Sequence, residues 1–271
     1  MTSEAVPLSA APFRPVADFA NILRSEFCKL RSVRSTVWTL GAAVAFNVGL
    51  AMLAGIFIPG RLSTQERATV DMVRLGLAGL HLSQIAFGVL GTLVITSEYG
   101  TGLIRATFTA VPQRRLVLAS KAIVLSVTAL VVGIGSSFAA YFAFQASLSD
   151  ESFRTSIGDP GVLRAVAGGG LYLTALGLLG FGLGAIIRSS AGTIATLFGL
   201  LFVPPILLGL LPQSWQTAIR PYVPLEAGSQ IFVATVHDPG SLGAWSGFGV
   251  FTFYTVLALI GGFALIKKRD A

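Results

Sequence analysis

Six long apolar segments divide this chain of 271 residues and constrain its fold more than any other feature. Each one approaches or exceeds the roughly 20 residues that an α-helix needs to cross a bilayer. They lie at about 35–58, 75–96, 116–146, 165–187, 191–211 and 244–266. Only 11% of the residues are charged, whereas soluble domains average about one quarter. The sequence therefore predicts an all-α polytopic membrane protein with six transmembrane helices.

Details within the segments predict how these helices are arranged. The third segment is long enough to tilt or to project from the membrane. The fourth and fifth are separated only by residues 188–190, so we expect a tight helical hairpin. Pro204 and Pro205 remove backbone donors within the fifth segment and predict a kink. Gly180 and Gly184 form a small-xxx-small pair that allows helices to approach closely.

The distribution of basic residues predicts the orientation of the chain. If the N-terminus is cytosolic, thirteen of the 19 basic residues fall in cytosolic segments and six in outer ones. This asymmetry follows the positive-inside rule and predicts that both termini are cytosolic. Arginine outnumbers lysine by 15 to 4, which is typical of GC-rich bacterial genomes. We therefore expect a multi-pass protein of the bacterial cytoplasmic (inner) membrane.

Two segments outside the predicted spans have an organisation of their own. Residues 1–16 lack periodicity and are interpreted as a flexible cytosolic tail. Residues 17–34 are predicted to form an amphipathic helix that lies in the headgroup region. Its apolar face would contain Phe19, Ile22, Leu23, Phe27 and Leu30, and its polar face Asn21, Arg24, Ser25, Glu26 and Lys29. The alternative is a surface helix of a small soluble domain, but no such domain is evident nearby.

The last connection, residues 212–243, is unusually apolar for an outer loop. Trp215, Tyr222 and Phe232 are scattered among its polar residues, and aromatic side chains favour the membrane interface. Backbone at membrane depth must be satisfied by protein or by a water-filled cavity. We therefore expect a short re-entrant or interfacial element before the last helix, with a loose loop as the alternative.

The usual signatures of enzymes and of nucleic-acid binding are missing from the sequence. There is no G-x-x-x-x-G-K-[ST] phosphate loop and no G-x-S-x-G nucleophile elbow, and the two histidines lie in no metal-binding spacing. The net charge of +7 lies beside apolar segments, which suits anionic headgroups. We expect no catalytic residue, no metal or other cofactor bound by this chain, and no nucleic-acid partner.

Polar residues inside the predicted spans have two interpretations. Asn47 lies in the first span, and His81 and Gln84 lie in the second. Such groups usually hydrogen-bond across helix contacts, but they also mark substrate paths in transporters. No span has a charged residue near its centre, which argues against a proton- or sodium-driven carrier. Asn47, His81 and Gln84 therefore remain candidates for either role.

A polar interruption at residues 97–115 separates the second and third spans. Gly100 and Gly102 allow a sharp chain reversal, and residues 103–110 can then form two helical turns that Pro112 ends. The helix would place Leu103, Ile104, Thr107 and Phe108 on one face and Arg105 on another. One interpretation is a basic loop that obeys the positive-inside rule. The other is a short helix whose exposed apolar face, with Leu103 and Phe108, docks into a groove of a cytosolic motor subunit.

Three motifs give the chain a specific resemblance. They are S-E-F-C-K-L-R-S-V-R-S at 25–35, E-Y-G-T-G at 98–102 and V-P-Q-R-R at 111–115. With six spans, they resemble the permease subunits of ATP-binding-cassette (ABC) exporters of the type-two class. The likeness is strongest to short actinobacterial permeases that are paired with a separate ATPase. It covers nearly the whole chain from Asp18 onward.

The resemblance implies a function and a set of contact residues. The coupling segment that contacts the ATPase would include Glu98, Gly100, Gly102, Leu103, Arg105, Phe108, Pro112 and Arg114. The connecting helix along the membrane would carry Arg24, Glu26, Lys29 and Arg31. ATP and magnesium would bind to the partner ATPase subunit, and a second permease copy would complete a homodimer or heterodimer in the lipid bilayer. The alternative function is a membrane scaffold or sensor that transports nothing.

Overall fold

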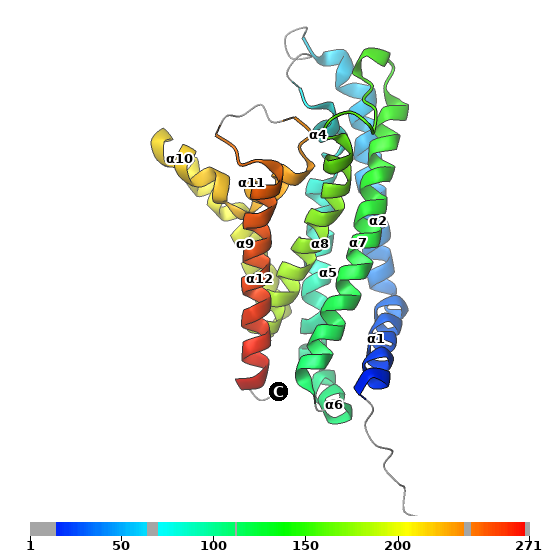
Figure 1. The fold of residues 1–271 in the computed structure, drawn as a ribbon, viewed down its shortest axis with the longest axis vertical. Helices are drawn as coiled ribbons and strands as arrows, with labels where there is room; N and C mark the ends of the chain where they lie inside the picture. Colours follow the sequence, from blue (N-terminus) through cyan, green and yellow to red (C-terminus); the bar gives the residue numbers. More distant parts are fainter. Residues whose placement is uncertain (1–14, 64–69, 112, 236–239, 269–271) are drawn as a thin grey trace, which may run out of the picture.

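The computed structural model describes residues 15–63, 70–111, 113–235 and 240–268, and within these ranges it is helical and contains no strand (Figure 1). Six of the described helices are long and apolar enough to cross a membrane. They are α2 (Arg34–Phe57), α5 (Leu80–Thr101), α7 (Arg114–Ser147), α8 (Val162–Ile187), α9 (Ser190–Leu208) and α12 (Ala244–Lys268). The chain is therefore an all-α, multi-pass membrane protein, as its sequence predicts.

Helix α8 lies at the centre of the bundle and contacts α5, α7, α9 and α12 (Figure 1). Its glycines make this position possible because backbones meet there with no side chain between them. A Cβ atom at Gly91 of α5 would overlap the carbonyl oxygen of Gly177, and one at Gly180 would lie 2.6 Å from the carbonyl oxygen of Gly88. The close approach predicted for Gly180 is thus a contact within one chain, between α8 and α5.

The long third span and the hairpin are both present. Helix α7 has 34 residues, which at 1.5 Å per residue is about 51 Å, longer than the roughly 30 Å of a hydrocarbon core. Helices α8 and α9 are joined through Arg188, whose φ of 61° ends α8 in the left-handed region. Ser189 then caps α9 by accepting a hydrogen bond from the backbone N–H of Gly192.

The second span differs from its predicted bounds at both ends. The segment expected to start at residue 75 is divided into α4 (Met72–Gly76), a turn at 77–79, and α5. The turn places Gly79 so close to α2 that an added Cβ would lie 2.6 Å from the Cα of Asn47. At the other end α5 continues to Thr101, five residues beyond the expected end.

Helix α1 (Pro15–Ser32) precedes the first span and confirms the helix predicted at the N-terminus. It ends before Val33, whose extended backbone separates it from α2. Helix α1 contacts α7 and lies at the same end of the bundle as the short helix α6 (Leu103–Ala110; Figure 1). Most of the predicted N-terminal tail lies outside the described residues.

The described connection before α12 is mainly helical over residues 213–232, so the loose-loop alternative is wrong for this part. It contains α10 (Gln213–Ile219), η3 (Arg220–Tyr222), α11 (Pro224–Ser229) and η4 (Gln230–Phe232). Phe232 is buried, and its ring lies 5.4 Å from that of Tyr172 on α8. The two other short turns are η1 (Pro59–Arg61) and η2 (Glu151–Phe153). Figure 1 shows α11 and α10 at the end of the molecule opposite to α6.

Candidate functional site

Four charged side chains from three helices meet at the end of the bundle that carries α6. They are Glu26 and Lys29 of α1, Glu98 of α5 and Lys121 of α7. We refer to these four residues as the charge cluster. Because its members come from helices far apart in the sequence, the cluster joins α1 to the inner part of the bundle.

The geometry of the cluster is an alternating ring of two ammonium groups and two carboxylates. Lys121 Nζ lies 2.7 Å from Glu26 Oε2 and 2.6 Å from Glu98 Oε1. Lys29 Nζ closes the ring at 2.7 Å from Glu26 Oε1 and 3.2 Å from Glu98 Oε1. The contact between Lys29 and Glu98 joins α1 to α5. Each charge therefore has two opposite charges as neighbours, and the net charge is zero.

Burial makes these pairs energetically important. The side chain of Lys121 is 2% exposed, and those of Glu26 and Glu98 are 7% and 11% exposed. Removal of one partner from a buried ion pair typically costs about 3–5 kcal/mol, because the remaining charge is left uncompensated. The second oxygen of Glu98, Oε2, is buried and has no hydrogen-bond partner among the described residues. The loss of any of the three buried members, Glu26, Glu98 or Lys121, should therefore destabilise the protein.

Lys29 lies at the edge of the cluster, with 45% of its side chain exposed. Burial by itself lowers the pKa of the Lys29 ammonium. The hydrogen bond and negative charge of Glu26, together with the charge of Glu98, outweigh that effect and raise its pKa above the usual value for lysine. Lys29 is therefore held in its charged form.

The burial of Glu26 changes the expected orientation of α1. The sequence pattern assigns Glu26 to the polar face and Phe27 to the apolar face of an interfacial helix. In the structure Glu26 is buried in the charge cluster, whereas Phe27 is half exposed, as expected of an apolar face turned to lipid. The burial of Glu26 is explained by its ion pair with Lys121, which the spacing of apolar residues in α1 cannot indicate. Arg24 and Arg31, the other two residues expected on the connecting helix, are exposed and do not join the cluster.

The cluster is directly connected to α6 through the end of α5. Glu98 lies four residues before Gly102, whose φ of 74° ends α5 and begins α6. The expected chain reversal is therefore made by Gly102 alone. Gly100 lies within α5, and Ser97 and Thr101 on the same turns donate hydrogen bonds to carbonyl oxygens one turn earlier. The position of α6 is thus set one helical turn from Glu98.

Helix α6 has the predicted bounds but not the predicted exposed face. Ile104 and Phe108 are buried against the bundle, and the guanidinium of Arg114 lies 5.3 Å from the centre of the Phe108 ring. Leu103 is 58% exposed, and Arg105 is exposed as well. The expectation of an exposed Phe108 is therefore wrong, because the i and i+4 positions of this helix anchor it. Pro112, expected to stop the helix, lies outside the described residues.

A crevice of about 360 Å³ opens beside the charge cluster. Its walls are mainly apolar and come from α1, α2 and α5, with Leu30, Val89 and Leu93 among them. Leu103 of α6 and Lys121 of α7 also line it. Leu103 on the exposed side of α6, the charge cluster and the first turn of α2 therefore all line the same crevice.

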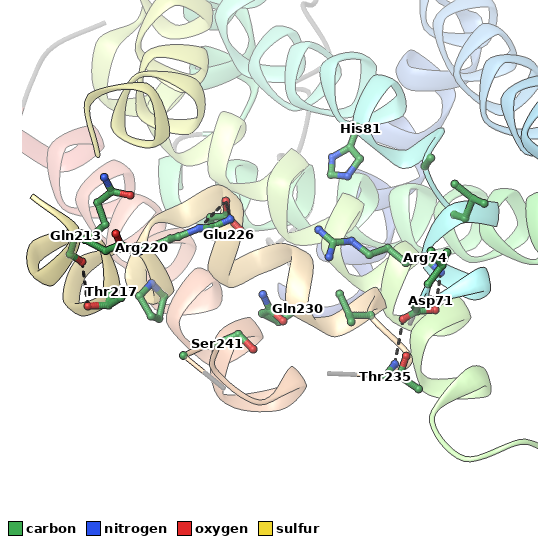
Figure 2. A pocket seen from close by; sticks show the side chains of 17 residues that line it. Asp71, Arg74, His81, Gln213, Thr217, Arg220, Glu226, Gln230, Thr235 and Ser241 are labelled. Carbon is green, nitrogen blue, oxygen red and sulfur yellow. Dashed lines mark hydrogen bonds and ion pairs between the residues drawn. The ribbon is translucent and has the colours of Figure 1, made fainter. Parts of the chain in front are cut away.

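The three polar residues expected inside the spans do not share a site. The amide of Asn47 donates to Ser136 Oγ at 2.9 Å, which joins α2 to α7. Gln84 Oε1 accepts a hydrogen bond from the Tyr172 hydroxyl at 2.5 Å, which joins α5 to α8. Both are buried, and the packing interpretation accounts for both. His81 instead lines a cavity at the opposite end of the bundle (Figure 2).

Lys121 is the site residue that sequence reasoning missed. In the sequence, Lys121 is only one of the basic residues whose distribution predicts the orientation of the chain. Lys121 lies seven residues after Arg114, within an apolar helix, and this position indicates a buried charge that needs a partner. An ionisable residue at such a depth almost always pairs with another charge. Glu26 and Glu98 are acids in predicted polar segments, near the ends of the neighbouring predicted helices.

The chemistry available here is ion pairing and helix positioning. Among the described residues no group of three or more His, Cys, Asp and Glu side chains could hold a metal ion. No protein-family model matches the chain, and no curated protein matches it. Its function is therefore inferred from the residues and their arrangement.

Proposed function

We propose that this chain is the transmembrane permease subunit of an ATP-driven ABC exporter. The observation that carries the proposal is the link between α6 and the charge cluster: a two-turn helix at the end of the bundle is joined, through one turn of α5, to a buried ion-pair network that reaches α1. A separate ATPase subunit would bind ATP and magnesium and would dock on α6. Both termini and α6 then lie in the cytosol of a bacterial cell.

The exposed side of α6 is the docking surface in this proposal. Leu103, beside the crevice, and Arg105 are exposed, whereas Ile104 and Phe108 hold the helix in place. A force on the exposed side is therefore transmitted to buried side chains rather than lost in a flexible loop. Glu98 is the nearest member of the charge cluster and carries the displacement to Lys121 of α7 and to Lys29 of α1.

ATP hydrolysis can shift the permease between two states only if the ATPase contacts α6 differently in each state. The coupling between the two sites is a free energy, and it acts in both directions. ATP binding to the partner would change the populations of the permease states, and the state of the permease would change ATP affinity. A charge cluster with several near-equivalent ion pairs provides contacts that two states can arrange differently.

A second permease copy completes the proposed transporter. The bundle exposes large apolar side chains on α2, α9 and α12, with Trp38, Ile206 and Ile260 among them. These faces suit lipid chains and a second copy alike, and a homodimer or a heterodimer would serve. The substrate path would lie along or between the spans of the two copies.

The test is co-purification of the chain with candidate ATPases, followed by measurement of ATPase stimulation. Leu103→Glu and Arg105→Glu alter the exposed side of α6 and should abolish both binding and stimulation. Leu210→Glu and Arg154→Glu make the same changes at exposed positions away from α6 and serve as matched controls. Retained binding and stimulation in the α6 variants would refute the docking role of α6. Binding without any ATP-driven transport would favour the scaffold or sensor alternative.

A further inference from the structure

A second cavity lies at the end of the molecule opposite to α6. It has a volume of about 680 Å³, within the range of roughly 300–1,000 Å³ typical of small-molecule sites. Its walls come from α4 and α5 on one side and from α10, α11 and the neighbouring short turns on the other (Figure 2). We refer to it as the α4–α11 cavity. It is separate from the charge cluster and from the crevice beside it.

The acidic side chains of this cavity already have partners. Asp71 Oδ1 accepts a hydrogen bond from the backbone N–H of Arg74 at 2.9 Å. Asp71 Oδ2 accepts from the N–H groups of Ala234 and Thr235 at 2.8 and 3.0 Å, which joins α4 to the segment after η4. Glu226 lies 3.5 Å from Arg220. The carboxylate of Asp71 thus holds the walls together and has little capacity left for a ligand.

Two hydrogen-bond donors of the same cavity, Arg74 and His81, have no such partners among the described residues. Within the described part of the chain, the guanidinium of Arg74 makes no hydrogen bond or ion pair. Figure 2 shows it pointing into the cavity, with His81 on the same side. His81 contacts the ring of Phe232 edge-on at 5.8 Å, and its ring nitrogens have no hydrogen-bond partner among the described residues. The amide of Gln230 lines the same space.

An arginine of this kind is suited to one class of ligand. The planar guanidinium binds carboxylate and phosphate oxygens through two parallel hydrogen bonds, and such charge-assisted bonds are the stronger ones. His81 and Gln230 add donors at the same cavity, and both side chains can donate N–H groups. The lining has two arginines and two carboxylates, so its formal charge is zero. Asp71 is engaged by backbone N–H groups and Glu226 by Arg220, which leaves the guanidinium of Arg74 as the one of these four groups without a partner in the described part of the chain.

We propose that the α4–α11 cavity binds an oxyanion, the phosphate or carboxylate group of a small molecule or of a lipid headgroup, with Arg74 as its principal partner. The inference does not depend on the permease function. It would stand if α6 proved to bind no ATPase.

The test measures binding of defined probes to the full chain. In neutral detergent, glycerol 3-phosphate and succinate are titrated by isothermal calorimetry to detect a soluble ligand. In phosphatidylcholine nanodiscs with or without phosphatidylglycerol, lipid retained on the protein is measured by native mass spectrometry to detect a headgroup. Saturable binding in the first arm assigns a soluble anion, and selective retention of phosphatidylglycerol assigns a lipid headgroup.

Variants distinguish the cavity from general attraction to a basic protein. Arg74→Gln should weaken binding of the active probe by about 10- to 100-fold, the loss expected for a charge-assisted hydrogen bond. Arg154→Gln, an exposed arginine outside the cavity, should leave affinity unchanged. The unfolding temperature of Arg74→Gln should equal that of the parent, since its side chain has no partner to lose. Absence of binding in both arms, or equal affinity in Arg74→Gln and the parent, would overturn the proposal.

Discussion

Lys121 Nζ of α7 lies 2.6 Å from Glu98 Oε1 of α5, and both side chains are almost completely buried. This contact brings together residues 23 positions apart on the two helices that flank α6. The ion pair therefore joins the end of α5 to the first part of α7, and α6 lies between them in the chain. Because Glu26 also binds Lys121, the same contact attaches α1 to this connection.

The first prediction concerns the stability that depends on Lys121. Lys121→Met should lower the free energy of unfolding by about 3–5 kcal/mol, since Glu26 and Glu98 would lose their buried counterion. Unfolding in detergent, followed by circular dichroism with increasing denaturant, measures this loss. Arg154→Met breaks an exposed pair with Glu151 and should cost about 1 kcal/mol or less.

A compensated variant separates charge imbalance from lost packing. Combining Lys121→Met with Glu26→Gln and Glu98→Gln removes both carboxylates that lose their buried counterion and should recover much of the stability. If the triple variant is as unstable as Lys121→Met alone, packing of the lysine chain rather than its charge is responsible.

The second prediction compares two glycines that are two residues apart. Gly102→Ala should destabilise the protein by about 1–2 kcal/mol, because an alanine at a φ of 74° is strained. An added Cβ meets nothing within 4 Å at Gly102 or at Gly100, so crowding contributes to neither variant. Gly100→Ala, within α5, should instead stabilise by about 0.5–1 kcal/mol. Opposite signs in thermal unfolding support the structure, and equal signs contradict it.

The third prediction concerns the contact between α5 and α8. Gly91→Ala should destabilise by at least about 1–3 kcal/mol, because the added methyl group would overlap the carbonyl oxygen of Gly177 and the helices must separate. Gly199→Ala in α9 is the matched control, since nothing lies within 4 Å of its added Cβ. Denaturant unfolding of both variants should show a loss only for Gly91→Ala.

The fourth prediction is a dependence of stability on alkaline pH. The pKa of Lys29 is raised in the folded chain by Glu26 and Glu98, despite an opposing effect of burial. A raised folded pKa gives stability that is fully present below the unfolded pKa, about 10.4, and is lost as pH rises through the folded value. The stability difference between the parent and Lys29→Gln should therefore shrink above that pH. A difference that stays constant into strongly alkaline solution would contradict this assignment.

Several parts of the structure could be predicted from local patterns. The bounds of α6 follow from Gly102, which permits the left-handed turn before it, and from the polar interruption between two apolar segments. Helix α12 and the hairpin of α8 and α9 also follow from apolar length and from the short polar connection. Each of these features depends on residues that are close together in the chain.

The errors arose where distant residues decide the outcome. Phe108 was expected to be exposed because its own helix does not indicate which face meets the bundle. Glu26 was expected on a solvated face, yet Lys121, 95 residues later, draws it inward. The start of α5 shifted because Gly79 approaches the backbone of Asn47. None of these contacts can be predicted from a segment of ten or twenty residues, because each joins residues that are further apart in the chain.

The apolar lengths along the chain are enough to predict a membrane protein, the number of its spans and the place of its polar interruptions, because a bilayer requires a minimum apolar length. Which charges are buried together and which faces stay open depends instead on how the helices pack. Buried charges must find counterions wherever the packed helices bring them, and that choice is made across the whole chain. The charge cluster beside α6 and the open guanidinium of Arg74 are both results of packing.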